Sequence, residues 1–75
     1  GDSGLAERLA NVATPTLVLW GDSDRIADAD YGRAYAEAIP GAQFQLLPKT
    51  GHLPQIETPG QLLEAIWAFA EGHAG

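Results

Sequence analysis

Cysteine and methionine are both absent from this chain of 75 residues. Without cysteine, neither disulfides nor a Cys-based zinc site can compensate for a small core. A chain of this length buries only about 60% of the surface that its unfolded form exposes, so we expect a marginal core. Methionine is missing even at position 1, which indicates that Gly1 is a processed end, a tag remnant or an excision from something longer. Routine removal of an initiator methionine would leave the same sequence.

Basic side chains are scarce: four Lys and Arg stand against ten Asp and Glu, and the net charge is −6. The four bases are scattered along the chain, at Arg8, Arg25, Arg33 and Lys49. This distribution argues against nucleic acid and against a membrane surface as partners. No apolar run approaches the length of a spanning helix, and no signal-peptide pattern opens the chain. We therefore expect a soluble, cytoplasmic protein.

A short helix and a buried strand are predicted for the first third of the chain. Leu5 and Leu9 lie four residues apart, which favours a helix over residues 3–10. Residues 16–20 then form a continuous apolar run that ends at Gly21. Because polar and apolar residues do not alternate in this run, we expect an interior strand of a parallel sheet, covered on both faces.

The middle of the chain predicts a second helix and a second strand. Asp28 is a good N-cap residue, and apolar residues follow it at the spacing of one helical face until Pro40-Gly41. Residues 43–46 then alternate polar and apolar side chains, which indicates a strand with one wetter face near the edge of the sheet.

The last third predicts a strongly apolar helix. Residues 58–61 (Thr-Pro-Gly-Gln) have the pattern of a capping box with Thr58 as the N-cap, and Gly72 ends the helix. We expect the aromatic rings of Trp20, Trp67 and Phe69 in the core. The predicted fold is therefore α/β: two parallel strands joined by a right-handed helical crossover, with flanking helices.

Two loops of this predicted fold carry ionisable side chains. Parallel strands direct their carboxyl ends to one edge of the sheet, where open α/β sheets bind ligands. The loop after the first strand carries Asp22, Asp24 and Asp28, and the loop after the second carries His52. A carboxylate that accepts a hydrogen bond from one imidazole nitrogen fixes the tautomer and leaves the other nitrogen to act as a general base. We therefore predict that a carboxylate of the first loop and His52 meet above the sheet.

Three segments together resemble the C-terminal part of α/β-hydrolases. Residues 15–26 are similar to the penultimate strand and acid loop of that family, and residues 39–42 to the link into its last strand. Gly51-His52-Leu53-Pro54, followed by Glu57 and Pro59, resembles the histidine loop. The resemblance covers roughly residues 12–70. It implies that residues 1–75 are the C-terminal portion of an incomplete α/β-hydrolase domain.

The resemblance also implies roles for single residues. Asp24 becomes the acid and His52 the base of a catalytic triad, and Asp22 becomes a solvated neighbour. Many relatives carry proline four residues after the acid, where this chain has Asp28. An N-cap aspartate starts the following helix equally well.

The activity that the resemblance implies is serine-type hydrolysis of ester or related bonds in a small-molecule substrate, without a cofactor. Relatives with other chemistry are dehalogenases, epoxide hydrolases and cofactor-free haloperoxidases. The family places its nucleophile and oxyanion hole in an N-terminal segment, so we expect the isolated chain to be inactive. The alternative is a non-catalytic fragment that associates with that segment, with another complementary chain, or with itself, because two strands cannot bury both faces with three helices.

Three features have simpler explanations. Gly1-Asp2-Ser3-Gly4 is similar to the nucleophile segment of trypsin-like proteases, but nothing precedes Ser3 that could supply the histidine and aspartate. Leu5 also replaces the final glycine of a G-x-S-x-G elbow, so helix capping explains Ser3 better. His73 belongs to a tail that we expect to be inert.

The third feature is a cluster of aspartates between residues 22 and 30. A calcium loop of the EF-hand type beginning at Asp22 would need Asp or Asn at Ile26, Gly at Ala27 and Glu at Arg33. All three requirements fail, so we expect no metal site.

Overall fold

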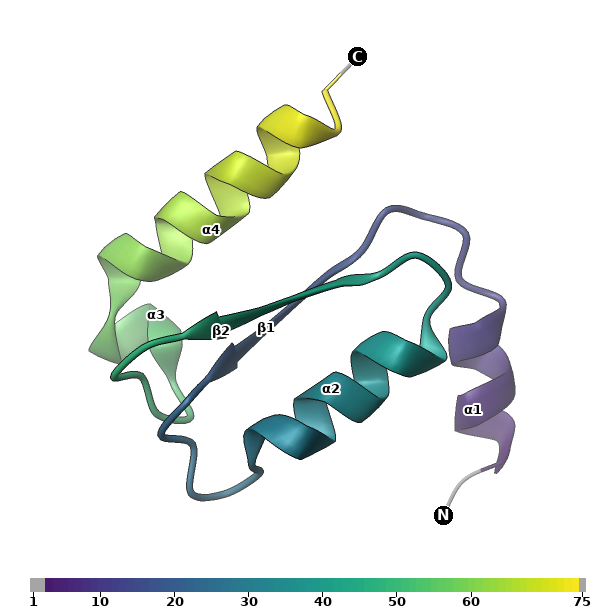
Figure 1. Ribbon diagram of the computed structural model, residues 1–75, viewed down its shortest axis with the longest axis horizontal. Helices are drawn as coiled ribbons and strands as arrows, with labels where there is room; N and C mark the ends of the chain where they lie inside the picture. The colour runs from purple at the N-terminus through teal and green to yellow at the C-terminus, as the bar shows by residue number, and fades with distance from the viewer. Residues whose placement is uncertain (1–2, 75) are drawn as a thin grey trace.

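The computed structural model describes residues 3–74. In chain order its elements are α1 (Ser3–Ala10), β1 (Leu17–Gly21), α2 (Ala29–Ala38), β2 (Gln43–Leu47), α3 (Pro54–Glu57) and α4 (Pro59–Gly72) (Figure 1). The predicted order of helix, strand, helix, strand and helix is confirmed. The short helix α3 was not predicted, because four residues are too few to show helical periodicity.

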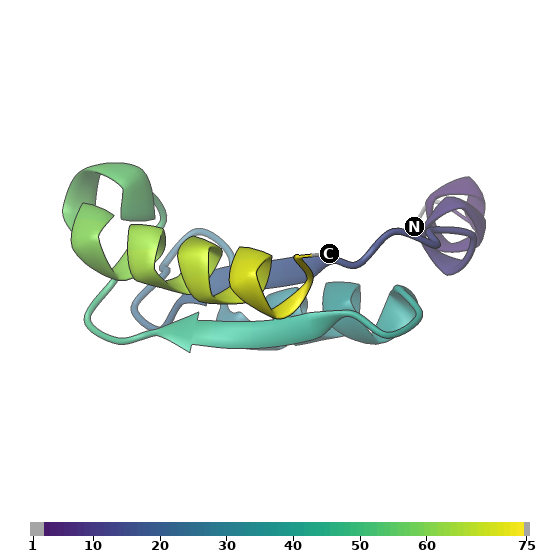
Figure 2. The same cartoon turned by 90° about the horizontal axis from the view of Figure 1, so that it is seen from above.

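The two strands form a parallel sheet with helices on either side. β1 and β2 run in register from Leu17 opposite Gln43 to Gly21 opposite Leu47, and α2 connects them. Figure 1 views the sheet nearly edge-on, with α2 and α4 on opposite sides, and Figure 2 shows the two strands separated. The described residues form a thin slab of 36 × 33 × 15 Å. The α/β fold with two parallel strands and flanking helices is therefore confirmed.

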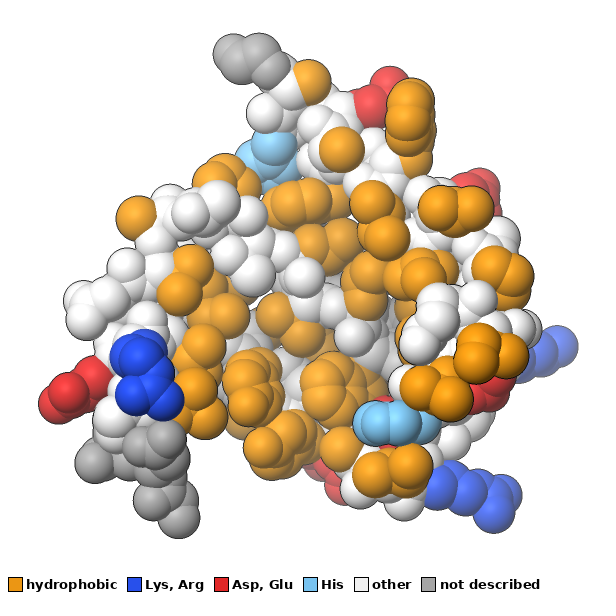
Figure 3. Space-filling view, turned by 180° about the vertical axis from the view of Figure 1, so that it is seen from behind, with side chains coloured by type: hydrophobic (Ala, Val, Ile, Leu, Met, Phe, Trp, Pro, Cys, Tyr) orange, Lys and Arg blue, Asp and Glu red, His pale blue; other side chains and the backbone are white. Residues whose placement is uncertain are grey.

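The core of this slab is small. Its buried apolar residues are Ala36, Ile39, Leu47 and Ala65. Within residues 3–74 the other edge of β1 is unpaired, and the strand is only half-buried from Leu17 to Trp20. Figure 3, which views the molecule from behind Figure 1, shows apolar side chains gathered across that face. The expectation that β1 is covered on both faces is wrong for the chain alone.

The aromatic residues do not all lie in the core. Trp67 is 69% exposed on α4, so its predicted burial is wrong; the apolar surface of α4 is wider than the sheet that it covers. Phe69 is half-buried. Trp20 is half-buried and packs on α2, where a Cβ added to Gly32 would lie 2.5 Å from the indole ring. This close contact sets the position of α2 on the sheet.

The beginning of α2 agrees with the prediction from the sequence, and the beginning of α4 differs from it. Asp28 caps α2, and its carboxylate accepts a hydrogen bond from the N–H of Tyr31 at 3.2 Å. The capping box predicted at Thr58 is wrong, because its side chain makes no capping hydrogen bond to α4. The Thr58 hydroxyl instead bonds with the hydroxyl of Thr50 at 2.8 Å, and Gln61 donates to the carbonyl of Pro48. The start of α4 is thereby attached to the turn that follows β2.

No helix among residues 3–74 is both long enough and apolar enough to cross a lipid bilayer.

Candidate active site

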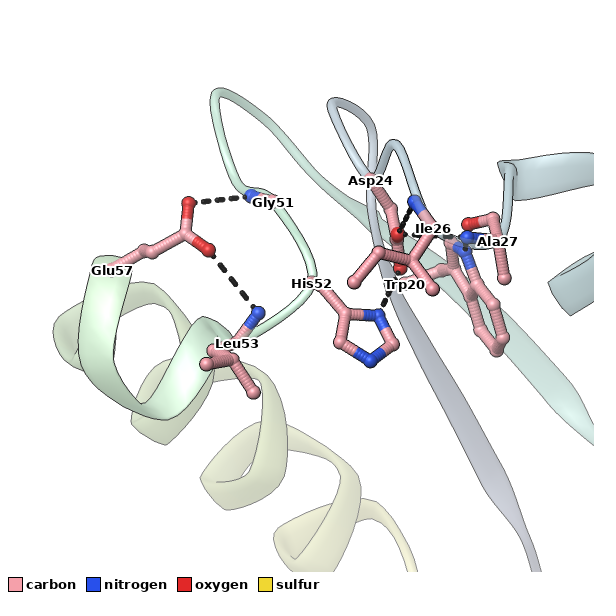
Figure 4. A network of polar contacts seen from close by, with 8 residues as sticks. All are labelled: Trp20, Asp24, Ile26, Ala27, Gly51, His52, Leu53 and Glu57. Atoms are coloured by element: carbon pink, nitrogen blue, oxygen red, sulfur yellow. Dashed lines mark hydrogen bonds and ion pairs between the residues drawn. The ribbon is translucent and has the colours of Figure 1, made fainter.

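Asp24 and His52 meet at the edge of the sheet where both strands end. His52 Nδ1 lies 2.9 Å from Asp24 Oδ2. The two residues are 28 positions apart in the chain, and each stands on the loop that follows its strand (Figure 4). The predicted juxtaposition is therefore found in the structure.

Asp24 is fixed by its own loop before it reaches the histidine. Its Oδ1 accepts hydrogen bonds from the backbone N–H groups of Ile26 at 2.9 Å and Ala27 at 3.0 Å. This leaves Oδ2 for His52. The Asp24 side chain is only 5% exposed. The hydrogen bond from Ala27, followed by that from the His52 ring, lowers the pKa of Asp24 below its ordinary value of 3.8, against the opposing effect of burial. Asp24 is thus an oriented, charged acceptor at neutral pH.

The same hydrogen bond determines which nitrogen of His52 is available. An ionised carboxylate can only accept, so Nδ1 must carry the proton, and Nε2 of the neutral ring holds a lone pair. Figure 4 shows Nε2 directed away from Asp24. The His52 side chain is 47% exposed and borders a cavity of about 110 Å³ formed with Leu19, Trp20, Gly21, Asp24, Gly51 and Pro54. A substrate group that gives up a proton could reach Nε2 from this side.

Gly21 allows the two loops to approach each other. A Cβ on Gly21 would lie 2.2 Å from the carbonyl oxygen of Thr50 and 2.3 Å from that of Gly51. Backbone hydrogen bonds join the loops at this point, from Asp22 N to Leu47 O at 3.0 Å and from Ser23 N to Thr50 O at 2.9 Å. The glycine that ends β1 is therefore a requirement of the site as well as a turn residue.

Asp22 is exposed, as expected of a solvated neighbour, and it also links the two loops. Its Oδ1 accepts hydrogen bonds from the Ser23 hydroxyl at 2.9 Å and from Thr50 N at 3.3 Å, on the histidine loop. The hydrogen bond from Ser23, with smaller contributions from the backbone N–H groups of Lys49 and Thr50, lowers the pKa of Asp22 below 3.8. Asp22 links the acid loop to the histidine loop, while Asp24 contacts the ring itself.

Glu57 is a site residue whose role was not predicted from the sequence. Its two carboxylate oxygens accept hydrogen bonds from Gly51 N at 2.9 Å and Leu53 N at 3.2 Å, on either side of His52. Helix α3 brings Glu57 back to this loop, and the absence of α3 from the predicted elements concealed the contact. The signal was the spacing of five residues between His52 and Glu57 in the histidine-loop motif.

The remaining candidates lie elsewhere. His73 Nδ1 is 2.9 Å from the carbonyl oxygen of Phe69, at the far end of α4. The side chain of Ser3 lies outside the part of the chain that the structure describes. Among residues 3–74, no three or more His, Cys, Asp or Glu side chains are grouped so that they could hold a metal ion.

Comparison with known proteins places this arrangement in a family context. The model of the family described as alpha/beta hydrolase fold matches residues 2–59. Lipase 3 of a Moraxella species is 33% identical over 67 residues, which cover 89% of this chain and 21% of the lipase. The 2-hydroxy-6-oxononadienedioate/2-hydroxy-6-oxononatrienedioate hydrolase of Cupriavidus pinatubonensis is 40% identical over 50 residues, 67% of this chain and 17% of that enzyme.

A solved structure shows the same fold. A thermophilic esterase from Thermogutta terrifontis superposes with a TM-score of 0.85 at 36% identity, over 89% of this chain and 25% of the esterase. The chain spans a quarter or less of the length of each of these three proteins.

Proposed function

The chain belongs to the α/β-hydrolase family, and on that basis we propose that it carries the acid, Asp24, and the base, His52, of a serine-type hydrolase. The substrate class is an ester or related bond of a small molecule. The observation that carries this proposal is the 2.9 Å hydrogen bond between Nδ1 and Oδ2, with half of the imidazole still exposed. A histidine held in this way can exchange protons with a substrate through Nε2.

The chemistry assigned to the two side chains is a pair of proton transfers. Nε2 of His52 removes the proton of a serine hydroxyl while the serine oxygen bonds to the substrate carbonyl carbon. The imidazolium that forms is stabilised by the charge of Asp24. Its Nε2 proton then passes to the leaving alkoxide as the ester bond breaks. Water repeats the sequence on the acyl-enzyme and returns the free acid and the serine.

The serine and the oxyanion hole belong to the part of the domain that the relatives have in addition to this segment. Because the isolated chain has neither of them, it should not turn over p-nitrophenyl acetate faster than its His52→Ala variant. Dehalogenase and epoxide hydrolase chemistry would use the same acid and base with a carboxylate nucleophile. A haloperoxidase of the same fold is a third chemical alternative. The residue at the elbow of the complementary segment separates serine from carboxylate nucleophiles.

The open apolar surface supports a second, non-catalytic role for the chain, namely association with a complementary chain. Large apolar side chains are at least 36% exposed at Ile26, Tyr31, Leu46, Leu53, Ile56, Leu63, Ile66 and Trp67. So many exposed apolar side chains on a thin slab are typical of a surface that another part of a domain covers. We propose that the missing hydrolase segment covers it, and that the isolated chain self-associates in its absence.

Sedimentation of the isolated chain across a range of concentrations tests this second role. We expect concentration-dependent oligomers that Trp67→Gln weakens, because this exposed indole contributes much of the apolar surface of α4. A monodisperse monomer with a cooperative melt at high temperature would contradict the association.

A chimera tests the catalytic proposal. Residues 12–74 replace the equivalent segment of the thermophilic esterase, whose fold they match. We expect hydrolysis of p-nitrophenyl acetate, with a loss of at least about 100-fold in kcat on His52→Ala. His73→Ala is the matched control and should stay within about twofold, because that ring contacts α4 alone. A folded chimera that keeps its full rate after His52→Ala would refute the assignment.

A further inference from the structure

We propose that Glu57 is a positioning residue for His52, because its carboxylate fixes the loop segment from which the imidazole reaches Asp24. This inference rests on the proposed function for its importance to catalysis. Its geometry is independent of that function.

The carboxylate of Glu57 holds the backbone on both sides of the histidine. Oε1 accepts from Gly51 N at 2.9 Å, and Oε2 accepts from Leu53 N at 3.2 Å. Figure 4 shows the two bonds reaching the loop directly before and directly after His52. A charged acceptor makes stronger hydrogen bonds than a neutral one. With both neighbouring amides held, the Cα of His52 has little freedom to move relative to Asp24.

The geometry of α3 explains why Glu57 can reach both amides. The N–H of Glu57 bonds to the carbonyl of Leu53 at 2.9 Å, so one helical turn returns residue 57 to the beginning of α3. Its side chain then extends back over the loop. Behind Glu57 the chain is anchored through the Thr58 and Thr50 hydroxyls, which lie 2.8 Å apart, and Thr50 is fully buried. The carboxylate is therefore presented from a fixed base.

Gly51 is matched to this carboxylate. A Cβ on Gly51 would lie 2.7 Å from Oε1 and 2.8 Å from Oε2 of Glu57. Real Cβ atoms do not come so close, so an alanine at this position must displace the carboxylate. The glutamate end is flexible, which makes the displacement inexpensive for the fold as a whole. Gly51→Ala therefore removes the geometry while leaving the charge of Glu57 in place.

Variants of Gly51 and Glu57 together distinguish the effect of the position of the Glu57 carboxylate from the effect of its charge. If Glu57 influenced His52 only through its negative charge, Glu57→Gln and Glu57→Ala would have equal effects and Gly51→Ala would have none. If it acts by position, Gly51→Ala perturbs His52 with the charge intact. Glu57→Gln is then intermediate, because its amide oxygen can accept from one N–H while its amide nitrogen cannot accept from the other.

The experiment is NMR of the full chain labelled with ¹⁵N, at about pH 8, where an ordinary histidine is neutral. Long-range proton–nitrogen spectra report which ring nitrogen carries the proton. In the parent chain we expect His52 in the Nδ1–H form. Glu57→Ala and Gly51→Ala should shift it to a mixture of tautomers, and hydrogen exchange of the Leu53 amide should accelerate by about tenfold. Glu64→Gln, which removes a charge from α4, should change neither. His73 is an internal reference in every sample.

Each outcome bears on one claim. If His52 in the parent chain is not in the Nδ1–H form, the Asp24–His52 pair fails and the proposed function fails with it. If the parent shows that form and folded Glu57→Ala and Gly51→Ala retain it, the positioning role of Glu57 is overturned while the pair stands. A loss in the Glu57 variants alone would overturn positioning in favour of charge. Should Glu57→Ala not fold, the milder Glu57→Gln and Gly51→Ala decide the question in the same way.

Discussion

Replacing Gly21 with alanine tests whether the contact between the two loops makes the site. The new Cβ would lie 2.2 Å from Thr50 O and 2.3 Å from Gly51 O, whereas real Cβ contacts stay above 3.0 Å. The loops must therefore separate by about 0.8 Å at this point, because backbone carbonyls cannot rotate away as side chains do. A movement of that size would stretch the 2.9 Å bond between Asp24 and His52 beyond hydrogen-bond range.

Overpacking of this kind costs about 1–3 kcal/mol of unfolding free energy. The esterase chimera is the right host, since its fold is complete and its unfolding can be followed with urea. We expect Gly21→Ala to lower both the urea midpoint and kcat, the latter by at least about tenfold. Gly60→Ala is the matched control, because a Cβ there meets nothing within 4 Å. Parent-like kcat and stability in Gly21→Ala would refute the argument from loop contact.

Three further predictions use the same host. Gly32→Ala should cost about 1–3 kcal/mol in a urea titration, because the added Cβ would lie 2.5 Å from the indole of Trp20. Stability should fall with acid below pH 3.8, mainly because the N–H of Ala27 favours ionised Asp24. The folded state then binds fewer protons than the unfolded state, so this contribution is complete above pH 3.8 and disappears as pH falls through the lowered pKa. Lys49→Gly should not destabilise the chain in thermal melts, because Lys49 has a φ of +53°, where glycine is unstrained.

Distinct results would contradict each of these. For Gly32 it is an unchanged urea midpoint. For Asp24, the contradicting result is that Asp24→Asn loses as much stability as the parent does when the pH falls below 3.8. For Lys49 it is a clear loss of stability in Lys49→Gly that Lys49→Ala does not show.

The features that the sequence predicted are those that local patterns encode. A continuous apolar run identified β1, alternation identified β2, and helical spacing identified α1, α2 and α4. Asp28 marked the beginning of α2, where its carboxylate accepts a hydrogen bond from the N–H of Tyr31, three residues away. The meeting of the two loops followed from a topological rule, because parallel strands end at one edge. The resemblance to the family then selected Asp24 among the aspartates of the first loop. These predictions did not require side-chain packing to be known.

The features that the sequence missed depend on contacts between distant residues and on which side chains of an apolar helix the sheet covers. Thr58 has the composition of a cap, but its hydroxyl contacts Thr50 across a loop, and composition cannot choose between the two partners. Glu57 acquires its role from α3, which is too short to recognise. Trp67 is apolar in a helical pattern, and the pattern does not show that its side chain is 69% exposed in the structure.

The central claim is that Asp24 acts on catalysis by orienting His52, and Asp24→Asn in the esterase chimera tests it most directly. We measure kcat and KM for p-nitrophenyl acetate in this variant and in Asp22→Asn. An asparagine can place its amide NH₂ against Nδ1 and so favour the wrong tautomer. For Asp24→Asn we predict a fall of about 10³–10⁴-fold in kcat with KM nearly unchanged. Asp22→Asn should lose far less, because its amide oxygen can still accept from Thr50. Equal losses in the two variants, or a parent-like kcat in Asp24→Asn, would contradict the claim.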